Sequence, residues 1–182
     1  IFILIAGLYH KRENPVNWWA MTLFLQFYCA GLFSMLNFVM FDPVDKTYHP
    51  YYGLLIFIFI WLNDTGAYIV GTAFGKHRLF PRVSPMKSWE GFAGGLVIAW
   101  IAALALAGSY PEVSWYHWTA FATMIVVFGT WGDLVESLIK RTYGVKDSGI
   151  LLPGHGGILD RFDSMMLATP AIWLYLRLFI QS

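Results

Sequence analysis

The chain has 182 residues, of which 58% are hydrophobic and only 13% are charged, and its formal net charge is +1. Because ionisable side chains are costly in hydrocarbon, this composition excludes an ordinary soluble domain and indicates an integral membrane protein whose few charges mark where water and substrates enter. The single cysteine, Cys29, excludes an internal disulfide.

Six apolar segments predict the membrane-spanning elements in chain order. The first, 1–9, is about half as long as a spanning helix, and the chain begins with Ile1, so we expect the C-terminal portion of a longer chain. Neither a repeat nor a linker divides residues 1–182, which are therefore predicted to form a single integral membrane domain with one truncated N-terminal span. Five whole spans are predicted at 18–41, 51–74, 89–107, 115–139 and 159–180.

Basic residues are concentrated at one end of this predicted bundle. The loops 10–17, 75–88 and 140–158, with the first turn that follows them, hold 10 of the 12 lysines and arginines. By the positive-inside rule, this end lies in the cytoplasm. The predicted fold class is therefore all-α, a polytopic transmembrane helix bundle with a polar cavity on its cytoplasmic side.

Polar residues interrupt the predicted span 51–74 about twelve residues from its start. At roughly 1.5 Å per residue this is about 18 Å along a helix, well inside a hydrocarbon core of about 30 Å. Asp64, together with Asn63 and Thr65, occupies this depth. We therefore expect Asp64 to face protein or a water-filled cavity.

The stretch around Ser84 and Pro85 predicts the start of a helix at the cytoplasmic surface. Ser84 suits the N-cap and Pro85 the first helical position, which places Lys87 in the first turn. Free N–H groups, the helix dipole and a lysine together suit an anion such as phosphate. The alternative is a plain helix cap in which Lys87 is interfacial and Trp89 anchors the membrane boundary.

The predicted span 115–139 ends in a polar face. Asp133, Ser137 and Lys140 fall at i, i+4 and i+7 of one helix, and Glu136 lies among them. We interpret this face as part of the site. The alternative is that the bilayer ends before Asp133 and that these residues are solvated charges at a helix end.

The most polar stretch of the chain is 146–163, in which Pro153 and several glycines argue against a helix before Gly157. The glycines allow the backbone to approach a ligand closely, and His155 lies among them. Asp160 and Asp163 share a helix face, where oxygen ligands favour Mg²⁺ over zinc. A basic set suits a polyphosphate, and phosphoryl or nucleotidyl transfer is the chemistry predicted from it: Lys140, Arg141, Lys146 and Arg161.

The run from Ser137 to Asp163, SLIKRTYGVKDSGILLPGHGGILDRFD, closely resembles the signature of the phosphatidate cytidylyltransferases, also called CDP-diacylglycerol synthases. Residues 63–91, NDTGAYIVGTAFGKHRLFPRVSPMKSWEG, are similar to a second block of that family, and together the two blocks cover nearly a third of the chain. The resemblance implies Mg²⁺-dependent transfer of the cytidylyl group of CTP to phosphatidic acid. It also implies a bacterial inner membrane with the active site facing the cytoplasm.

The resemblance also implies roles for individual residues. The primary metal ligands would be Asp133 and Asp160, with Asp163 and Glu136 nearby, for Mg²⁺ alone or with a second cation. The catalytic residues implied are Asp133, Asp160, Lys140, Arg161 and His155. The substrate-binding residues implied are Ser84, Lys87, Ser137, Arg141, Lys146, Asp147, Gly156 and Gly157.

Two other functions remain as alternatives. A cation-coupled transporter would use Asp64 and Asp133 as an ion site, but it leaves the basic glycine-rich loop unexplained. A CDP-alcohol phosphotransferase would need a DxxDGxxAR motif, which the sequence lacks. The expected partners are the bilayer and the two substrates, with no nucleic acid. The spacing of Gly91 and Gly95 suits close packing either of two helices within the chain or of two copies in a homodimer.

Overall fold

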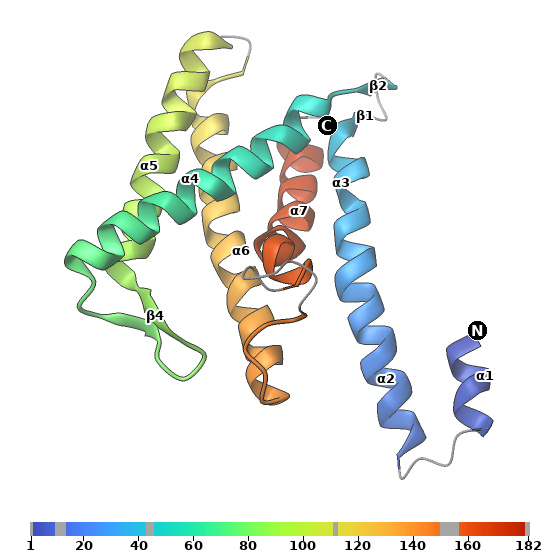
Figure 1. Ribbon diagram of the computed structural model, residues 1–182. Helices are drawn as coiled ribbons and strands as arrows, with labels where there is room; N and C mark the ends of the chain where they lie inside the picture. Colours follow the sequence, from blue (N-terminus) through green and yellow to red (C-terminus); the bar gives the residue numbers. More distant parts are fainter. Residues whose placement is uncertain (1, 10–13, 43–45, 111–112, 150–156, 181–182) are drawn as a thin grey trace.

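A computed structural model describes the chain except for residues 1, 10–13, 43–45, 111–112, 150–156 and 181–182, and its long helices form a bundle (Figure 1). The helices are α1 (Phe2–Tyr9), α2 (Pro15–Gln26), α3 (Leu32–Met40), α4 (Pro50–Phe74), α5 (Trp89–Ser109), α6 (Trp115–Thr142) and α7 (Leu159–Phe179), and a π-helical turn, η1 (Phe27–Gly31), joins α2 to α3. Two small antiparallel hairpins pair β1 (Phe41–Asp42) with β2 (Thr47–Tyr48), and β3 (Arg78–Phe80) with β4 (Ser84–Ser88). The predicted all-α bundle is confirmed.

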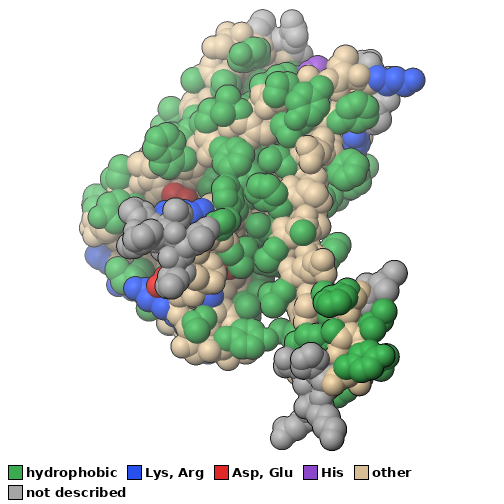
Figure 2. Space-filling model, turned by 45° about the vertical axis from the view of Figure 1, so that its right-hand side comes forward, with side chains coloured by type: hydrophobic (Ala, Val, Ile, Leu, Met, Phe, Trp, Pro, Cys, Tyr) green, Lys and Arg blue, Asp and Glu red, His purple; other side chains and the backbone are tan. Residues whose placement is uncertain are grey.

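Within the described residues, four helices are long and apolar enough to cross a membrane: Pro15–Met40, Pro50–Phe74, Trp89–Ser109 and Trp115–Thr142. They match four of the five predicted whole spans. The fifth, 159–180, forms α7 but is not among the four, because charged residues lie in its first turns and Arg177 lies near its end. Hydrophobic side chains spread over most of the visible face of the molecule (Figure 2).

The two ends of the bundle differ as the charge distribution predicts. In Figure 1 the start of α2, the β3–β4 hairpin and the end of α6 point toward one end, and β1 and β2 lie at the other. The first end carries the basic residues of the hairpin and of the last turn of α6. The site described below lies toward this basic end.

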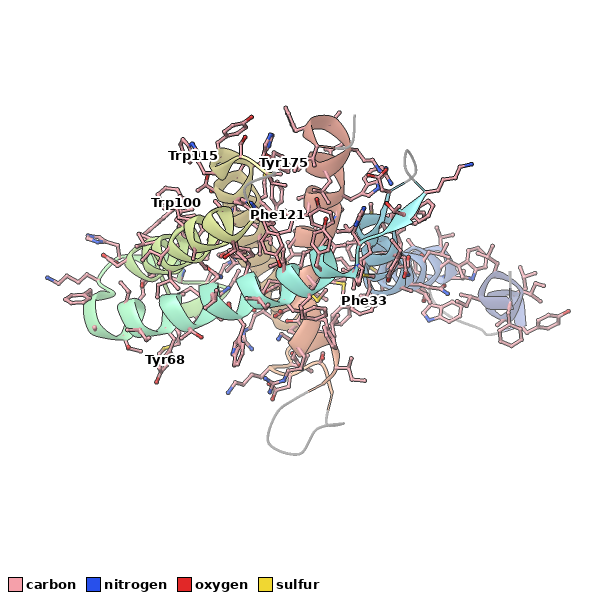
Figure 3. All side chains as sticks on the ribbon, turned by 90° about the horizontal axis from the view of Figure 1, so that it is seen from above. Phe33, Tyr68, Trp100, Trp115, Phe121 and Tyr175 are labelled. Atoms are coloured by element: carbon pink, nitrogen blue, oxygen red, sulfur yellow. The ribbon has the colours of Figure 1, made fainter. Side chains whose placement is uncertain are left out.

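Aromatic and aliphatic side chains of α4, α6 and α7 form the core. Ile56, Phe59, Phe121 and Ile172 are fully or almost fully buried, and the rings of Phe59 and Phe121 meet edge to face at 5.9 Å. Figure 3 shows Phe121 among the helices, whereas Tyr68 points away from them. These contacts hold α6 in the middle of the bundle, and its polar end is therefore fixed relative to α4 and α7.

Glycines of α5 allow it to pack closely against α4. A Cβ atom on Gly91 would lie 2.8 Å from the carbonyl oxygen of Ala67, and one on Gly95 would lie 2.8 Å from that of Asn63. Both distances are shorter than side-chain contacts allow, so the glycines are required for the approach. The sequence left open whether Gly91 and Gly95 pack two helices of one chain or two copies of the protein. In the structure they pack α5 against α4 of the same chain.

The predicted helix start at Ser84 is wrong. Residues Ser84–Ser88 form β4, and α5 begins only at Trp89. Ser88 is the N-cap: its Oγ accepts a hydrogen bond of 3.1 Å from the backbone N–H of Gly91. Pairing with β3 holds the chain extended through Pro85, so Lys87 lies on a strand and not in a first helical turn.

Candidate active site

The polar face of α6 forms one wall of the candidate site. The hydroxyl of Ser137 donates a hydrogen bond of 3.1 Å to Oδ1 of Asp133, which lies one turn earlier. Asp133 and Ser137 therefore lie on one face of α6, as their spacing predicts. Lys140 lies about one turn further along α6. Its ammonium group pairs with two other carboxylates and not with Asp133.

Lys140 links α6 to α7. Its Nζ lies 2.6 Å from Oδ1 of Asp160 and also forms an ion pair with Oε2 of Glu136. The pair is enclosed, since the side chain of Lys140 is 14% exposed and that of Glu136 only 1%. Oε1 of Glu136 is buried and has no hydrogen-bond partner in the described part of the chain. If Glu136 is ionised, its buried negative charge is compensated by the ammonium group of Lys140.

Asp160 also holds the segment that follows α6. Its Oδ2 accepts hydrogen bonds from the backbone N–H and hydroxyl of Ser148, at 2.9 and 2.8 Å, and from the backbone N–H of Gly157, at 2.7 Å. A Cβ atom on Gly157 would lie 2.3 Å from the hydroxyl of Ser148. This glycine therefore allows two parts of the chain to meet around one carboxylate.

Lys87 brings the β3–β4 hairpin to the same face of α6. Its Nζ lies 2.5 Å from Oδ2 of Asp133, and both side chains are partly exposed. At the far end of the hairpin, the ring of Phe80 meets that of Trp131 edge to face at 5.8 Å. A polar and an apolar contact thus connect the hairpin to α6 at two points.

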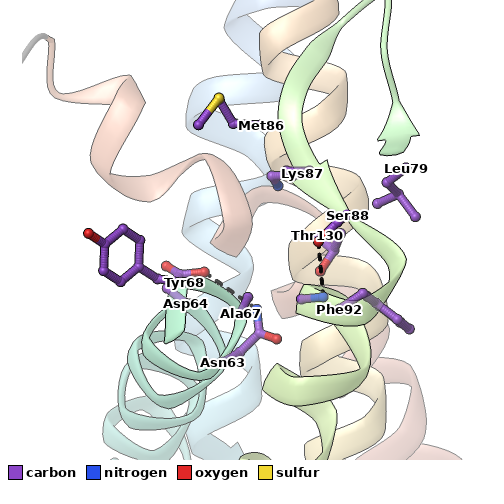
Figure 4. A pocket seen from close by; sticks show the side chains of 11 residues that line it. Asn63, Asp64, Ala67, Tyr68, Leu79, Met86, Lys87, Ser88, Phe92 and Thr130 are labelled. Atoms are coloured by element: carbon purple, nitrogen blue, oxygen red, sulfur yellow. Dashed lines mark hydrogen bonds between the residues drawn. The ribbon is translucent and has the colours of Figure 1, made fainter. Parts of the chain in front are cut away.

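A cavity of about 190 Å³ opens beside this contact, between α4, the hairpin, α5 and α6 (Figure 4). Its lining includes Asp64 and Asn63 from α4, Lys87 from β4 and Thr130 from α6. The amide of Asn63 donates a 3.4 Å hydrogen bond to Asp64. The prediction that Asp64 faces protein or a cavity is confirmed, and this cavity, lined by both polar and apolar residues, lies toward the basic end of the bundle.

The acidic residues and lysines form one electrostatic network across α4, β4, α6 and α7. Asp64 interacts with Lys87 and Asp133, while Asp163 interacts with Asp133 and Glu136. With Asp160 included, five carboxylates and two lysines, Lys87 and Lys140, belong to this network within the described part of the chain. The carboxylates therefore outnumber the lysines. Oxygen donors of this kind are those that Mg²⁺ prefers.

The carboxylates do not hold a metal ion by themselves. Within the described residues, no three His, Cys, Asp or Glu side chains are grouped to coordinate one. Asp160 has its oxygens engaged by Lys140, Ser148 and Gly157, which uses most of the acceptor capacity of a carboxylate. The oxygens of Asp133 and Glu136 are less fully engaged, so the donor set fits Mg²⁺ only with substrate oxygens or water as further ligands.

The remaining predicted site residues lie around this network or outside the described residues. Arg141, Lys146, Asp147 and Arg161 are exposed, and Nη1 of Arg141 donates a hydrogen bond to the carbonyl oxygen of Val145. His155 and Gly156 fall in the part of the chain that the structure does not describe. The cations of this group are therefore accessible to a soluble ligand.

Two features of the site escaped the sequence-based prediction. Ser148 binds Asp160 through both its backbone and its hydroxyl, and its position between Asp147 and Gly149 was the available signal. The ion pair of Lys87 with Asp133 joins residues 46 positions apart. The spacing of Lys87 and Asp133 in the sequence does not predict this ion pair, because it depends on how the β3–β4 hairpin packs against α6.

Residues 1–179 match the Cytidylyltransferase family. The chain is similar to the phosphatidate cytidylyltransferase of Bacillus subtilis (strain 168), with 49% identity over 124 residues, which cover 67% of this chain and 46% of the relative. Over the same length it is 49% identical to the phosphatidate cytidylyltransferase of Staphylococcus saprophyticus, covering 67% and 47% of the two chains. That of Staphylococcus aureus (strain COL) is 48% identical with the same coverage. The chain spans about half the length of these relatives.

Proposed function

The chain belongs to the cytidylyltransferase family, and from this premise we propose that it transfers the cytidylyl group of CTP to phosphatidic acid. The products are CDP-diacylglycerol and pyrophosphate. The network of carboxylates and lysines beside the cavity is the observation that supports this activity most strongly, because the reaction brings together two polyanions whose charge needs partners.

The reaction is a single in-line displacement. A phosphate oxygen of phosphatidic acid attacks the α-phosphorus of CTP, a new phosphorus–oxygen bond forms, and the bond from the α-phosphorus to the bridging oxygen breaks to release pyrophosphate. A general base is not required, because a phosphate monoester with a second pKa of about 6 is already largely ionised near neutral pH. The protein's part is to position the two phosphates and to stabilise the charge that develops on the leaving group.

The lysines of the network are proposed to make these contacts. Lys87 lines the cavity, and Lys140 lies at the junction of α6 and α7, so each can exchange a carboxylate partner for a phosphate oxygen. Arg141, Lys146 and Arg161 add accessible positive charge around them. His155, Gly156 and Ser84 remain predicted contributors to substrate binding.

Mg²⁺ is the proposed cofactor, alone or with a second cation. It would be held by oxygen atoms drawn from Asp133, Glu136 and Asp163 together with substrate phosphate oxygens or water, because no three of the described acidic side chains are grouped around one point. Asp160 is the further predicted ligand if Lys140 moves to a phosphate. When bound, it supplies positive charge that polarises the reacting phosphate groups. The buried Oε1 of Glu136 lacks a described hydrogen-bond partner, which supports this residue as a ligand.

The proposed location is a bacterial inner membrane with the site facing the cytoplasm. Phosphatidic acid keeps its acyl chains in the bilayer and its phosphate at the surface, whereas CTP is soluble, so a site near the basic end of the bundle gives both of them access. The excess of lysine and arginine at this end supports the orientation. A homodimer remains a proposal that does not depend on Gly91 and Gly95, which pack within the chain.

The test is consumption of CTP by the intact purified protein in detergent with Mg²⁺, with and without phosphatidic acid. We expect pyrophosphate release only when the lipid is present, and its loss in Asp160→Asn. Ser109→Ala, at an exposed position at the end of α5 away from the hairpin, is the control and should keep activity above half. Flux of an ion through liposomes without any consumption of CTP would instead support the transporter and refute the proposed reaction.

A further inference from the structure

The first long helix of the bundle contains one irregular turn. Residues Phe27–Gly31 form a π turn, which fits one more residue into a turn than an α-helix does and often occurs at functional sites. Preceding it, α2 has no buried residue, whereas Tyr28 within the turn is only 4% exposed. The π turn therefore coincides with the one place in residues 15–31 where a side chain, that of Tyr28, is buried in the protein.

Tyr28 reaches the backbone of α6 next to a carboxylate of the site. Its hydroxyl donates a long hydrogen bond of 3.5 Å to the carbonyl oxygen of Gly132, and its ring stacks on that of Phe24 with a centroid distance of 5.9 Å. Gly132 immediately precedes Asp133 in the sequence. The contact therefore acts on the peptide unit that carries Asp133.

At the same glycine, α6 and α7 approach each other closely. A Cβ atom on Gly132 would lie 2.6 Å from the backbone oxygen of Asp163. Tyr28 thus contacts the junction at which Asp133 of one helix and Asp163 of the next are brought together. The carboxylates of Asp163, Glu136 and Asp133 are near enough to interact electrostatically with its hydroxyl.

We propose that Tyr28 is a positioning residue for the acidic cluster: the π turn directs its hydroxyl to Gly132 and so fixes the backbone of Asp133 relative to Asp163. This inference rests on the proposed function, in which these carboxylates bind Mg²⁺. Tyr28 itself touches neither substrate nor metal in this account. A neutral donor suits this place, because a further anion would repel the three carboxylates and a cation would compete for them.

The first test is Tyr28→Phe, which removes the hydroxyl and keeps the ring. Groups that orient metal ligands typically contribute about 10- to 100-fold to metal affinity or activity. We expect the Mg²⁺ concentration for half-maximal activity to rise about tenfold, with the KM for CTP changed less than twofold. The rise in melting temperature on addition of Mg²⁺, a readout that needs no turnover, is expected to require correspondingly more Mg²⁺.

The second test removes the ring of Tyr28 together with its hydroxyl. Tyr28→Leu keeps an apolar side chain in the π turn but no group that can reach the carbonyl oxygen of Gly132. Because α2 has no buried residue, this change breaks few other contacts, and we expect the same loss of Mg²⁺ response as in Tyr28→Phe or a larger one. Phe27→Leu, at a neighbouring position that is 66% exposed, is the matched control and is expected to behave as wild type.

The results separate this inference from a structural role and from the proposed function. If Tyr28→Phe lowers the melting temperature equally with and without Mg²⁺ and leaves the Mg²⁺ requirement unchanged, Tyr28 only packs and the inference is overturned. If the wild-type protein consumes no CTP, the proposed reaction fails, yet the Mg²⁺-dependent melting of the two variants still decides the role of Tyr28.

Discussion

Lys140→Met is the variant that most sharply tests the network. It removes the ammonium group that lies between Glu136 and Asp160 while keeping much of the side-chain volume. Asp160 retains its hydrogen bonds from Ser148 and Gly157, so the main consequence falls on Glu136, whose side chain is 1% exposed. The variant leaves that carboxylate buried without its cation.

The expected size of this effect follows from the burial of the pair. Removing one partner of a buried ion pair costs about 3–5 kcal/mol, whereas exposed pairs contribute about 0–1 kcal/mol. At about 2–4 °C per kcal/mol for a chain of this size, the melting temperature should fall by about 6–20 °C. Adding Glu136→Gln to Lys140→Met removes the isolated charge, and we expect the double variant to recover most of the loss.

Tryptophan fluorescence during thermal unfolding in detergent measures these differences. Arg141→Met is the matched control, because Arg141 is the next residue, is exposed and contacts only a local carbonyl oxygen among its described hydrogen bonds. It should change stability by less than about 0.5 kcal/mol. A Lys140→Met protein as stable as this control, or a double variant no more stable than Lys140→Met, would refute the buried ion pair.

Three further predictions concern the elements around the site. Ser88→Ala should lower the free energy of unfolding by about 1 kcal/mol by removing the cap of α5, while Ser84→Ala should have no measurable effect in the same denaturation assay. Gly95→Ala should destabilise the protein by about 1–3 kcal/mol because its Cβ would lie 2.3 Å from Oδ1 of Asn63, whereas Gly108→Ala, with no atom within 4 Å of its Cβ, should be neutral or stabilising. Lys87→Met should increase amide hydrogen exchange in the β3–β4 hairpin by releasing it from Asp133, and unchanged exchange would contradict that connection.

The helices were predictable from the sequence because apolar runs and their polar interruptions are local signals. The predicted segments 51–74 and 89–107 correspond to Pro50–Phe74 and Trp89–Ser109 within two residues. The prediction that Asp64 faces a cavity followed from depth alone. The error at Ser84 has a physical cause: Ser-Pro and Ser-Trp both suit a helix start, and only pairing with β3 decides between them.

The site was predictable in its residue types but not in its partners. The sequence places the carboxylates and Lys140 in helices, but it puts Lys87 in a helical turn instead of in β4. It also does not show that Lys140 binds Asp160 and that Lys87 binds Asp133. These pairs depend on how the hairpin and α7 pack against α6. The role of Tyr28 has no signature in the sequence, because residues 18–41 are apolar on nearly every side and one extra residue in a turn disturbs no polar–apolar pattern.

Labelled CTP tests the central claim most directly. The intact protein is incubated with phosphatidic acid, Mg²⁺ and CTP labelled either at the α-phosphorus or at the γ-phosphorus, and label is measured in the lipid and aqueous fractions. Cytidylyl transfer predicts that the α label enters the lipid and the γ label leaves as pyrophosphate, in equal amounts. Transfer of the γ label to the lipid would show phosphoryl transfer instead and would contradict the proposed reaction.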